Sequence, residues 1–161
     1  RKSVMDNYLK ILEESLQKKL QLLDKLQEYN EAQCRVFSAE EVEVEKFDEY
    51  ITEKEKLIEQ VIHIDDGFET LYANVAEALK NNKDKYAEQI KVLQDLVRRV
   101  TEKHVTVQAQ EARNKALVEA YFAKEKQQIG QGRRSSQVAY NYYSSASKPV
   151  YMEPQFMDSR K

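Results

Sequence analysis

Two histidines and one cysteine are the residues of this 161-residue chain that most readily act as bases, nucleophiles or metal ligands. His63 has Glu59 one helical turn before it and Asp65 two residues after it, a set that could transfer a proton. We interpret this set as a capping or solvated cluster at a helix end. His104 continues an apolar row and is interpreted as a core or boundary histidine. Cys34 has no histidine near it in the sequence, and we interpret it as a small packing residue.

The spacings that established catalytic and metal motifs require are missing. A di-iron bundle needs Glu three residues before His on two helices, whereas this chain has Gln60 and Thr101 at those positions. Gly130-x-Gly132 lacks the Gly-Lys-Ser/Thr of a phosphate-binding loop and follows a predicted helix. A single cysteine argues against an internal disulfide, a zinc finger or an iron–sulfur cluster, and it fits a reducing cytoplasm. We therefore expect no enzyme, no metal and no cofactor.

The charge balance narrows the classes of partner. The chain has 26 Lys and Arg against 28 Asp and Glu, a net charge of −2, which argues against general nucleic-acid binding. Residues 1–10 lack the apolar core of a signal peptide, and no stretch approaches 18 apolar residues. The polar faces of the amphipathic segments mix both signs of charge. We therefore expect a cytoplasmic protein without stable membrane insertion.

The residues that break helices are unevenly distributed. Residues 1–129 contain Gly67 and no proline, whereas residues 130–161 hold both prolines, two glycines, six serines and four tyrosines. A long sequence without breakers suits helices, and a β-rich fold needs turns. The sequence therefore predicts an all-α elongated helical bundle over residues 1–129. It predicts a flexible Ser/Tyr-rich tail over residues 130–161, which has no helical period and little apolar surface to bury.

Apolar residues at three- and four-residue spacing predict helices over residues 3–36, 38–62, 66–80 and 84–129. The first two would form an antiparallel hairpin, followed by a short helix and a long one. Lys54 interrupts the apolar row of the second helix, so its stem should pack while its ammonium group reaches solvent.

Capping patterns set the expected breaks between these helices. Ser38 with Glu41, and Asp66 with Glu69, each match the capping box that begins a helix. The pair Asn81-Asn82 is the expected exit of the third helix, since asparagine tolerates left-handed backbone.

The apolar row of the last predicted helix weakens at Glu111 and Asn114, where we expect the intramolecular core to stop. An apolar cluster follows without an obvious internal partner, and such clusters often bind proteins. In the alternative interpretation, the cluster packs on the amino-terminal end of the first helix. The cluster comprises Leu117, Val118, Tyr121 and Phe122.

Four segments of the chain resemble the FlgN-type flagellar export chaperones of Gram-positive anaerobes, and the order of predicted helices agrees. The segments are Asp65-Asp66-Gly67-Phe68-Glu69, Gln108-Ala-Gln-Glu-Ala-Arg-Asn-Lys115, Ala139-Tyr140-x-Tyr142-Tyr143 and Pro154-Gln-Phe-Met-Asp158. The resemblance implies a cytoplasmic bacterial chaperone of type III export. Such a protein binds the C-terminal helical segments of hook–filament junction proteins, of the FlgK and FlgL types, and delivers them to the cytoplasmic domain of the export gate.

The resemblance also implies that a tyrosine near the carboxyl end contributes to gate docking. Tyr140 is the best match, with Tyr142 and Tyr143 as alternatives. The alternative function is a structural coiled-coil or scaffold protein that forms a constitutive homodimer. The residues predicted to bind partners are Leu117, Val118, Tyr121, Phe122, Ile129, Tyr140, Tyr142 and Tyr143.

Overall fold

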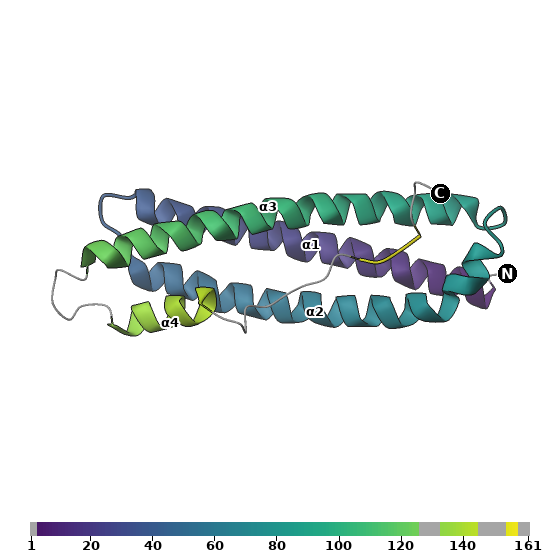
Figure 1. Cartoon of the computed structure of the whole chain (residues 1–161), viewed down its shortest axis with the longest axis horizontal. Coiled ribbons are helices and arrows are strands. Elements are labelled where there is room, and N and C mark those ends of the chain that lie inside the picture. The colour runs from purple at the N-terminus through teal and green to yellow at the C-terminus, as the bar shows by residue number, and fades with distance from the viewer. Residues whose placement is uncertain (1–2, 126–132, 145–153, 158–161) are drawn as a thin grey trace. The chain divides into compact units, whose positions relative to one another are not determined.

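The structure, a computed structural model, describes residues 3–125, 133–144 and 154–157 of the chain. Four α-helices and no strand occur within them, so the predicted all-α class is confirmed. The helices are α1 (Val4–Ser38), α2 (Val44–Lys80), α3 (Ala87–Glu125) and α4 (Arg133–Tyr143) (Figure 1).

The chain divides into two compact units, and each contains part of α1, α2 and α3. Unit 1 comprises Arg1–Leu23, Gln60–His104 and Tyr151–Lys161, and unit 2 comprises Asp24–Glu59 and Val105–Val150. Each unit is therefore a set of three packed helix segments. A short extended segment is added in unit 1, and α4 is added in unit 2.

The contacts between helices fix their directions in unit 2. Glu31 of α1 contacts Gln110 of α3, and Phe37 contacts Tyr121, so residue numbers rise together along α1 and α3 and these helices run parallel. Phe37 contacts Phe47, and Lys54 contacts Asn30, so residue numbers rise along α2 as they fall along α1. The predicted antiparallel hairpin of α1 and α2 is confirmed.

The connection between α1 and α2 differs from the prediction. Ser38 ends α1 and donates a hydrogen bond to the carbonyl of Cys34 at 3.4 Å, while α2 begins only at Val44. The predicted capping box of Ser38 with Glu41 is therefore wrong. The serine satisfies a carbonyl of the helix before it, and the five residues 39–43 form the connection.

The predicted break at Asp66 and Gly67 is also wrong, because α2 runs through both residues. A glycine inside a helix costs about 1 kcal/mol relative to alanine, which packing on both sides readily offsets. Asp65 and Phe68 flank the glycine and are both buried. The exit at Asn81-Asn82 is confirmed, since α2 ends at Lys80 and a turn precedes α3.

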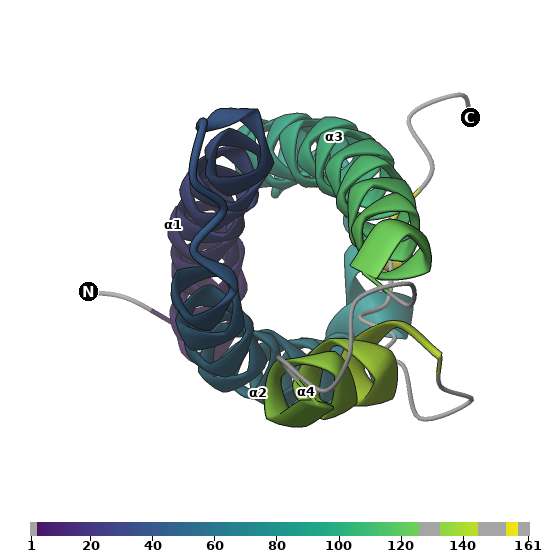
Figure 2. The ribbon, with the colours of Figure 1, turned by 90° about the vertical axis from the view of Figure 1, so that its left-hand side faces the viewer.

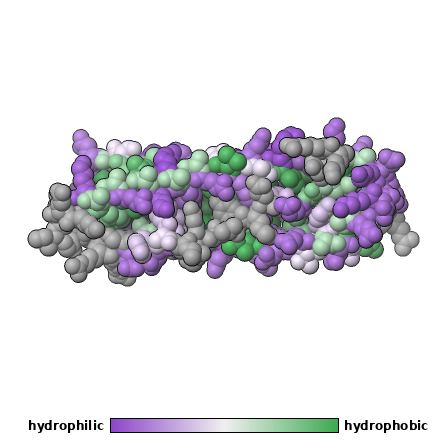
Figure 3. All heavy atoms as spheres, in the orientation of Figure 1, coloured by the Kyte–Doolittle hydropathy of each residue, from purple (hydrophilic) through white to green (hydrophobic). Residues whose placement is uncertain are grey.

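Apolar side chains at the predicted spacing form a core in each unit, while the face in Figure 3 is mostly hydrophilic with smaller apolar areas. The most deeply buried apolar residues of unit 1 are Leu9, Leu12, Leu16, Leu23, Val61, Val75, Leu79, Leu93 and Val100. Those of unit 2 are Leu26, Phe47, Ile51, Ile58, Val107 and Ala139.

Candidate functional site

A buried lysine lies at the centre of the candidate site in unit 2. The Lys54 side chain is fully buried, and its Nζ lies 2.8 Å from Glu111 Oε1 and 2.8 Å from Asn30 Oδ1. The expectation that this ammonium group reaches solvent is wrong. Oxygens from α3 and α1 replace its water, because a buried charge is tolerated when it is paired and hydrogen-bonded.

The polar contacts continue along unit 2 beyond the lysine. Asn114 is fully buried and donates to the carbonyl of Asn30 at 3.1 Å, and Gln33 donates to the carbonyl of Phe47 at 3.1 Å. The predicted end of the core at Glu111 and Asn114 is therefore wrong. These positions interrupt the apolar row but remain in the core, because their side chains pair across helices. We call Asn30, Gln33, Lys54, Glu111 and Asn114 the Lys54 network.

The helix α4 covers one side of the Lys54 network. The Tyr142 hydroxyl donates to Glu111 Oε2 at 2.7 Å, and Lys54 Nζ lies 4.5 Å from the centre of the Tyr142 ring. Figures 1 and 2 show α4 beside the first part of α2. The helix falls in the predicted flexible tail, so the prediction that residues 130–161 have no helical period is wrong for this part. Its buried face is spaced as in a helix, with Ala139, Tyr142 and Tyr143 at i, i+3 and i+4.

An aromatic cluster adjoins this covered side. Phe37 of α1 lies with its ring centre 4.9 Å from that of Phe47 and 5.5 Å from that of Tyr121. Tyr121 lies 5.4 Å from Phe122, and Phe47 lies 6.5 Å from Tyr143. The apolar end of α3 thus packs on the carboxyl-terminal end of α1. Both earlier expectations are wrong: the cluster does have an internal partner, and that partner is not the amino-terminal end of the first helix.

The predicted binding residues differ in how accessible they are. Val118 is buried, while Leu117, Tyr121 and Phe122 are half-buried. On α4, Tyr140 is 67% exposed, whereas Tyr142 and Tyr143 are each 6% exposed. Ile129 lies outside the described residues. Of the predicted set, the structure therefore brings Tyr121, Phe122 and Tyr143 to the aromatic cluster and Tyr142 to the Lys54 network.

The tyrosine hydroxyls on the buried face of α4 have different surroundings. Tyr143 Oη is buried without a hydrogen-bond partner among the described residues. Burial, together with the negative charge of Glu111, raises the pKa of Tyr143. At the edge of the site, a hydrogen bond from Gln110 lowers the pKa of Glu31, and Arg113 adds to this. Near neutral pH, the Tyr143 phenol therefore stays uncharged and the Glu31 carboxylate stays negatively charged.

Unit 1 contains a second buried polar set. Lys19 Nζ lies 2.5 Å from Asp65 Oδ1, with both side chains buried. His104 is also buried, and burial together with the positive charge of Lys19 lowers its pKa to about 4. The core position expected for His104 is confirmed. His63 and Asp65 lie inside α2 and not at a helix end, so the capping interpretation is wrong.

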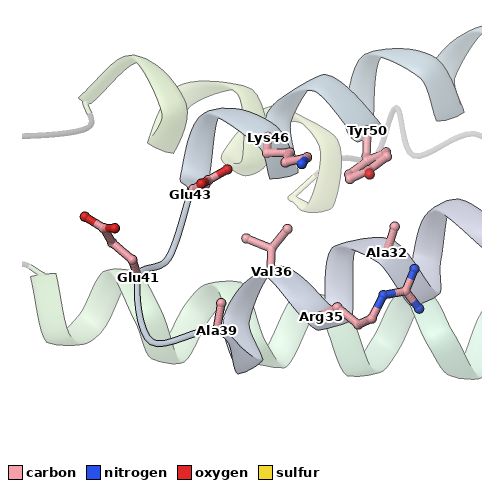
Figure 4. A pocket seen from close by; sticks show the side chains of 8 residues that line it. All are labelled: Ala32, Arg35, Val36, Ala39, Glu41, Glu43, Lys46 and Tyr50. Atoms are coloured by element: carbon pink, nitrogen blue, oxygen red, sulfur yellow. The ribbon is translucent and has the colours of Figure 1, made fainter.

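A shallow groove of about 260 Å³ lies in unit 2 beside the connection of α1 and α2 (Figure 4). Its lining mixes apolar side chains with both signs of charge, so it lacks a defined acid–base pair. The lining residues are Ala32, Arg35, Val36, Ala39, Glu41, Glu43, Lys46 and Tyr50. Among the described residues, no group of three or more His, Cys, Asp or Glu is placed to hold a metal ion. None of the described helices has the length and apolar character needed to cross a bilayer.

Residue type alone does not predict the polar residues that are most deeply buried. In α1, Lys19, Asn30 and Gln33 occupy the alternating three- and four-residue row that also contains Leu16, Leu23 and Leu26. Extending that row through polar residues is the signal that could have found them. Because lysine is rarely buried, the residue type of Lys19 alone would place it on the solvated face.

Comparisons of the chain with protein families, with characterised proteins and with solved structures found no match. Function is therefore inferred from the geometry of unit 2, where a short helix covers a charged network and an aromatic cluster, together with the sequence segments described above.

Proposed function

We propose that this chain is a FlgN-type export chaperone with a non-catalytic binding role. It binds the C-terminal helical segments of hook–filament junction proteins in the cytoplasm and delivers them to the cytoplasmic domain of the flagellar export gate. The observation that supports this proposal most strongly is α4, a short helix that contacts unit 2 through one face.

The contacts that hold α4 on unit 2 are of a kind that a helix from a partner can replace. An isolated helix of 11 residues is marginal in water, so the stability of α4 depends on its contacts with unit 2. These contacts include one hydrogen bond from Tyr142, the rings of Tyr142 and Tyr143, and the methyl group of Ala139. A longer amphipathic helix from a partner offers the same kind of contact over more surface.

The chemistry beneath α4 defines what a replacement helix must carry. Displacing Tyr142 removes the hydrogen bond to Glu111 Oε2 and opens one side of Lys54. A buried acceptor left without a donor is costly, so an incoming helix needs a hydroxyl or amide donor at that position. Apolar residues one turn away would contact Phe47 and the rest of the aromatic cluster. We therefore expect an amphipathic partner helix that presents a polar donor within its apolar face.

The exposed tyrosine of α4 suits a second contact. Tyr140 projects away from the buried face, whereas Tyr142 and Tyr143 pack inward. We assign Tyr140 to gate docking, since a tyrosine contributes contact area with a polar end. The packed state of α4 leaves this side chain accessible.

The central experiment is calorimetric titration of the purified full chain with C-terminal segments of junction proteins. We expect one-to-one binding. Tyr142→Ala should tighten it several-fold, because α4 then competes less well for the same surface. Tyr140→Ala, on the exposed face of the same helix, is the matched control and should leave the affinity unchanged. Absence of binding to every such segment would reject the proposal.

Two further measurements separate this role from the scaffold alternative. Light scattering of the free chain should give the mass of a monomer, and a tight dimer would favour a coiled-coil scaffold. Pull-down of the chaperone–segment complex by the export-gate domain should weaken in Tyr140→Ala. If it weakens in Tyr142→Phe instead, the gate contact belongs to the other face of α4.

A further inference from the structure

Residues 154–157 form an extended segment that contacts the surface of unit 1. The Phe156 ring centre lies 5.0 Å from that of Tyr72 on α2, and Gln94 Nε2 on α3 donates to the Met157 carbonyl at 3.1 Å. These contacts join residues far apart in the sequence, 63 positions for the hydrogen bond. The segment is drawn in yellow in Figure 1.

The side chains of this segment differ in exposure. Gln155 is exposed, whereas Phe156 and Met157 are half-buried. Pro154 fixes its own φ at about −65°, a value that an extended polyproline-type backbone shares, so less entropy is lost when the segment docks. The segment therefore contacts unit 1 as an extended peptide with the Phe156 ring on the protein side.

The surface beneath Phe156 belongs to α2 itself. Phe68 and Tyr72 lie one helical turn apart with ring centres 6.4 Å apart and nearly parallel, and Phe68 is buried in the core. Burial raises the pKa of Tyr72, in agreement with its covered position. Phe68 and Tyr72 both belong to α2, so this aromatic floor is formed by the helix itself and needs no residue from the docked segment.

We propose that Phe68, Tyr72 and Gln94 form a binding site on unit 1 for an extended peptide that carries a phenylalanine. Residues 154–157 are the intramolecular occupant of this site. The aromatic floor selects the phenylalanine, while Gln94 binds a backbone carbonyl that any residue could supply. Short extended peptides are commonly recognised in this way, by side-chain pockets together with main-chain hydrogen bonds. The inference is independent of the function proposed for unit 2.

Because residues 154–157 belong to the same chain as the site, a small contact is sufficient to dock them. A tethered segment has an effective concentration of about millimolar, so it occupies the site about half of the time even when the free peptide binds with a Kd of only about one millimolar. A partner that presents a phenylalanine in an extended segment would therefore compete when it binds more tightly or is itself held nearby. Removing the ring of Phe156 should vacate the site and let an added peptide enter.

The test is a nuclear magnetic resonance titration of the full chain carrying Phe156→Ala. The probe is a peptide with the sequence of residues 151–159, and the readout is the side-chain amide resonance of Gln94, identified by its loss in Gln94→Leu. We expect a saturable shift at about millimolar peptide. The same peptide with alanine in place of its phenylalanine should give at least a five-fold smaller shift. Gln155→Ala is the matched control chain, and it should bind the peptide as weakly as the unsubstituted chain.

Either of two results would overturn the inference. One is a folded Phe156→Ala chain whose Gln94 resonance does not respond to the peptide, and the other is an equal response to the peptide without its ring. Far-ultraviolet circular dichroism establishes that the helices are retained. If Phe156→Ala loses them, Phe156→Leu keeps the apolar volume without the aromatic face, and its titration is judged by the same two results.

Discussion

Both units of the chain bury a lysine, but they neutralise it in different ways. In unit 1, Lys19 meets Asp65 of α2, and the two side chains lie within the three-helix core. In unit 2, Lys54 meets Glu111 of α3, and Tyr142 of α4 completes the surroundings of that carboxylate. The first pair is enclosed by the long helices, whereas the second is completed by α4, a helix of only 11 residues.

This difference separates a structural role from a binding role. Buried ion pairs add little net stability, but they penalise any packing that leaves a charge without its partner, so they can specify how helices align. We interpret the pair in unit 1 as such an alignment device. In unit 2 the penalty for an unpaired buried charge depends on α4, because departure of α4 exposes Lys54 and Glu111 to water. Water then solvates both charges and reduces that penalty. The unit 2 surface can therefore exchange one helix for another.

The largest expected effect comes from breaking the enclosed pair. Asp65→Ala removes the carboxylate that Lys19 contacts inside unit 1. Removing one partner of a buried pair costs about 3–5 kcal/mol, and urea denaturation should report this loss in the free energy of unfolding. Asp66→Ala is the matched control, since Asp66 is the exposed neighbour, and it should stay within about 0.5 kcal/mol of the unsubstituted chain.

The equivalent change in unit 2 should cost less. Glu111→Ala also removes a carboxylate from a buried lysine, but release of α4 lets water reach Lys54. We expect a loss of about 2–3 kcal/mol in the same denaturation experiment, below the loss for Asp65→Ala. Equal losses at the two sites would mean that unit 2 is as tightly enclosed as unit 1.

The next effect concerns pH and belongs to unit 1. Because the pKa of His104 is about 4 in the folded chain and 6.5 in its ordinary state, the unfolded chain binds this proton first as pH falls. The contribution of His104 therefore lowers the free energy of unfolding between pH 6.5 and 4, by about 1.4 kcal/mol per pH unit and about 3 kcal/mol in total. His104→Gln should remove this part of the pH dependence.

The control for the pH effect is the other histidine. His63 is exposed on the same unit, so His63→Gln should leave the slope of stability against pH unchanged. If the two variants have the same slope as the unsubstituted chain, protonation of His104 is not linked to folding, and the core around Lys19 must admit water.

The sequence predicts a buried helix position where an apolar residue occupies it, but not where a charged residue does. Apolar residues at three- and four-residue spacing predicted three long helical regions and the hairpin, because burial of one face is what stabilises such helices. The rows continue through Lys19, Lys54, Asp65 and Glu111, which residue type alone places at the surface. Their burial depends on a partner from another helix, and one sequence does not reveal such pairs.

The site on α4 shows the same limit on a smaller scale. Ala139, Tyr142 and Tyr143 have helical spacing, but two aromatic residues and one alanine are too short a pattern to predict a helix among serines. The helix exists because Glu111 and the aromatic cluster offer a surface for it. Tyr140, Tyr142 and Tyr143 could be named as binding candidates from the sequence, whereas which of them face inward required the structure.

A smaller effect tests how strongly α4 is held. Tyr142→Phe keeps the ring beside Lys54 but removes the hydrogen bond to Glu111, and a hydrogen bond to a charged group contributes about 1.5–3 kcal/mol. We expect hydrogen exchange of the α4 amides to accelerate about ten-fold or more, while exchange in unit 1 stays the same. Tyr140→Phe is the matched control, and an equal acceleration there would show that the hydroxyl bond does not hold α4.

The smallest effect distinguishes the two parts of α2. Gly67 lies in the unit 1 part of this helix, and a methyl group added there would meet nothing within 4 Å. Gly67→Ala should therefore raise the free energy of unfolding by about 0.5–1 kcal/mol, because alanine loses less backbone entropy in a helix. Ala73→Gly, at an exposed position of the same helix, should lower it by a similar amount.

Amide exchange of Gly67→Ala then compares the two parts of α2. If exchange slows in residues 60–80 but not in residues 44–59, the units open separately. Equal slowing would mean that α2 opens as one cooperative helix.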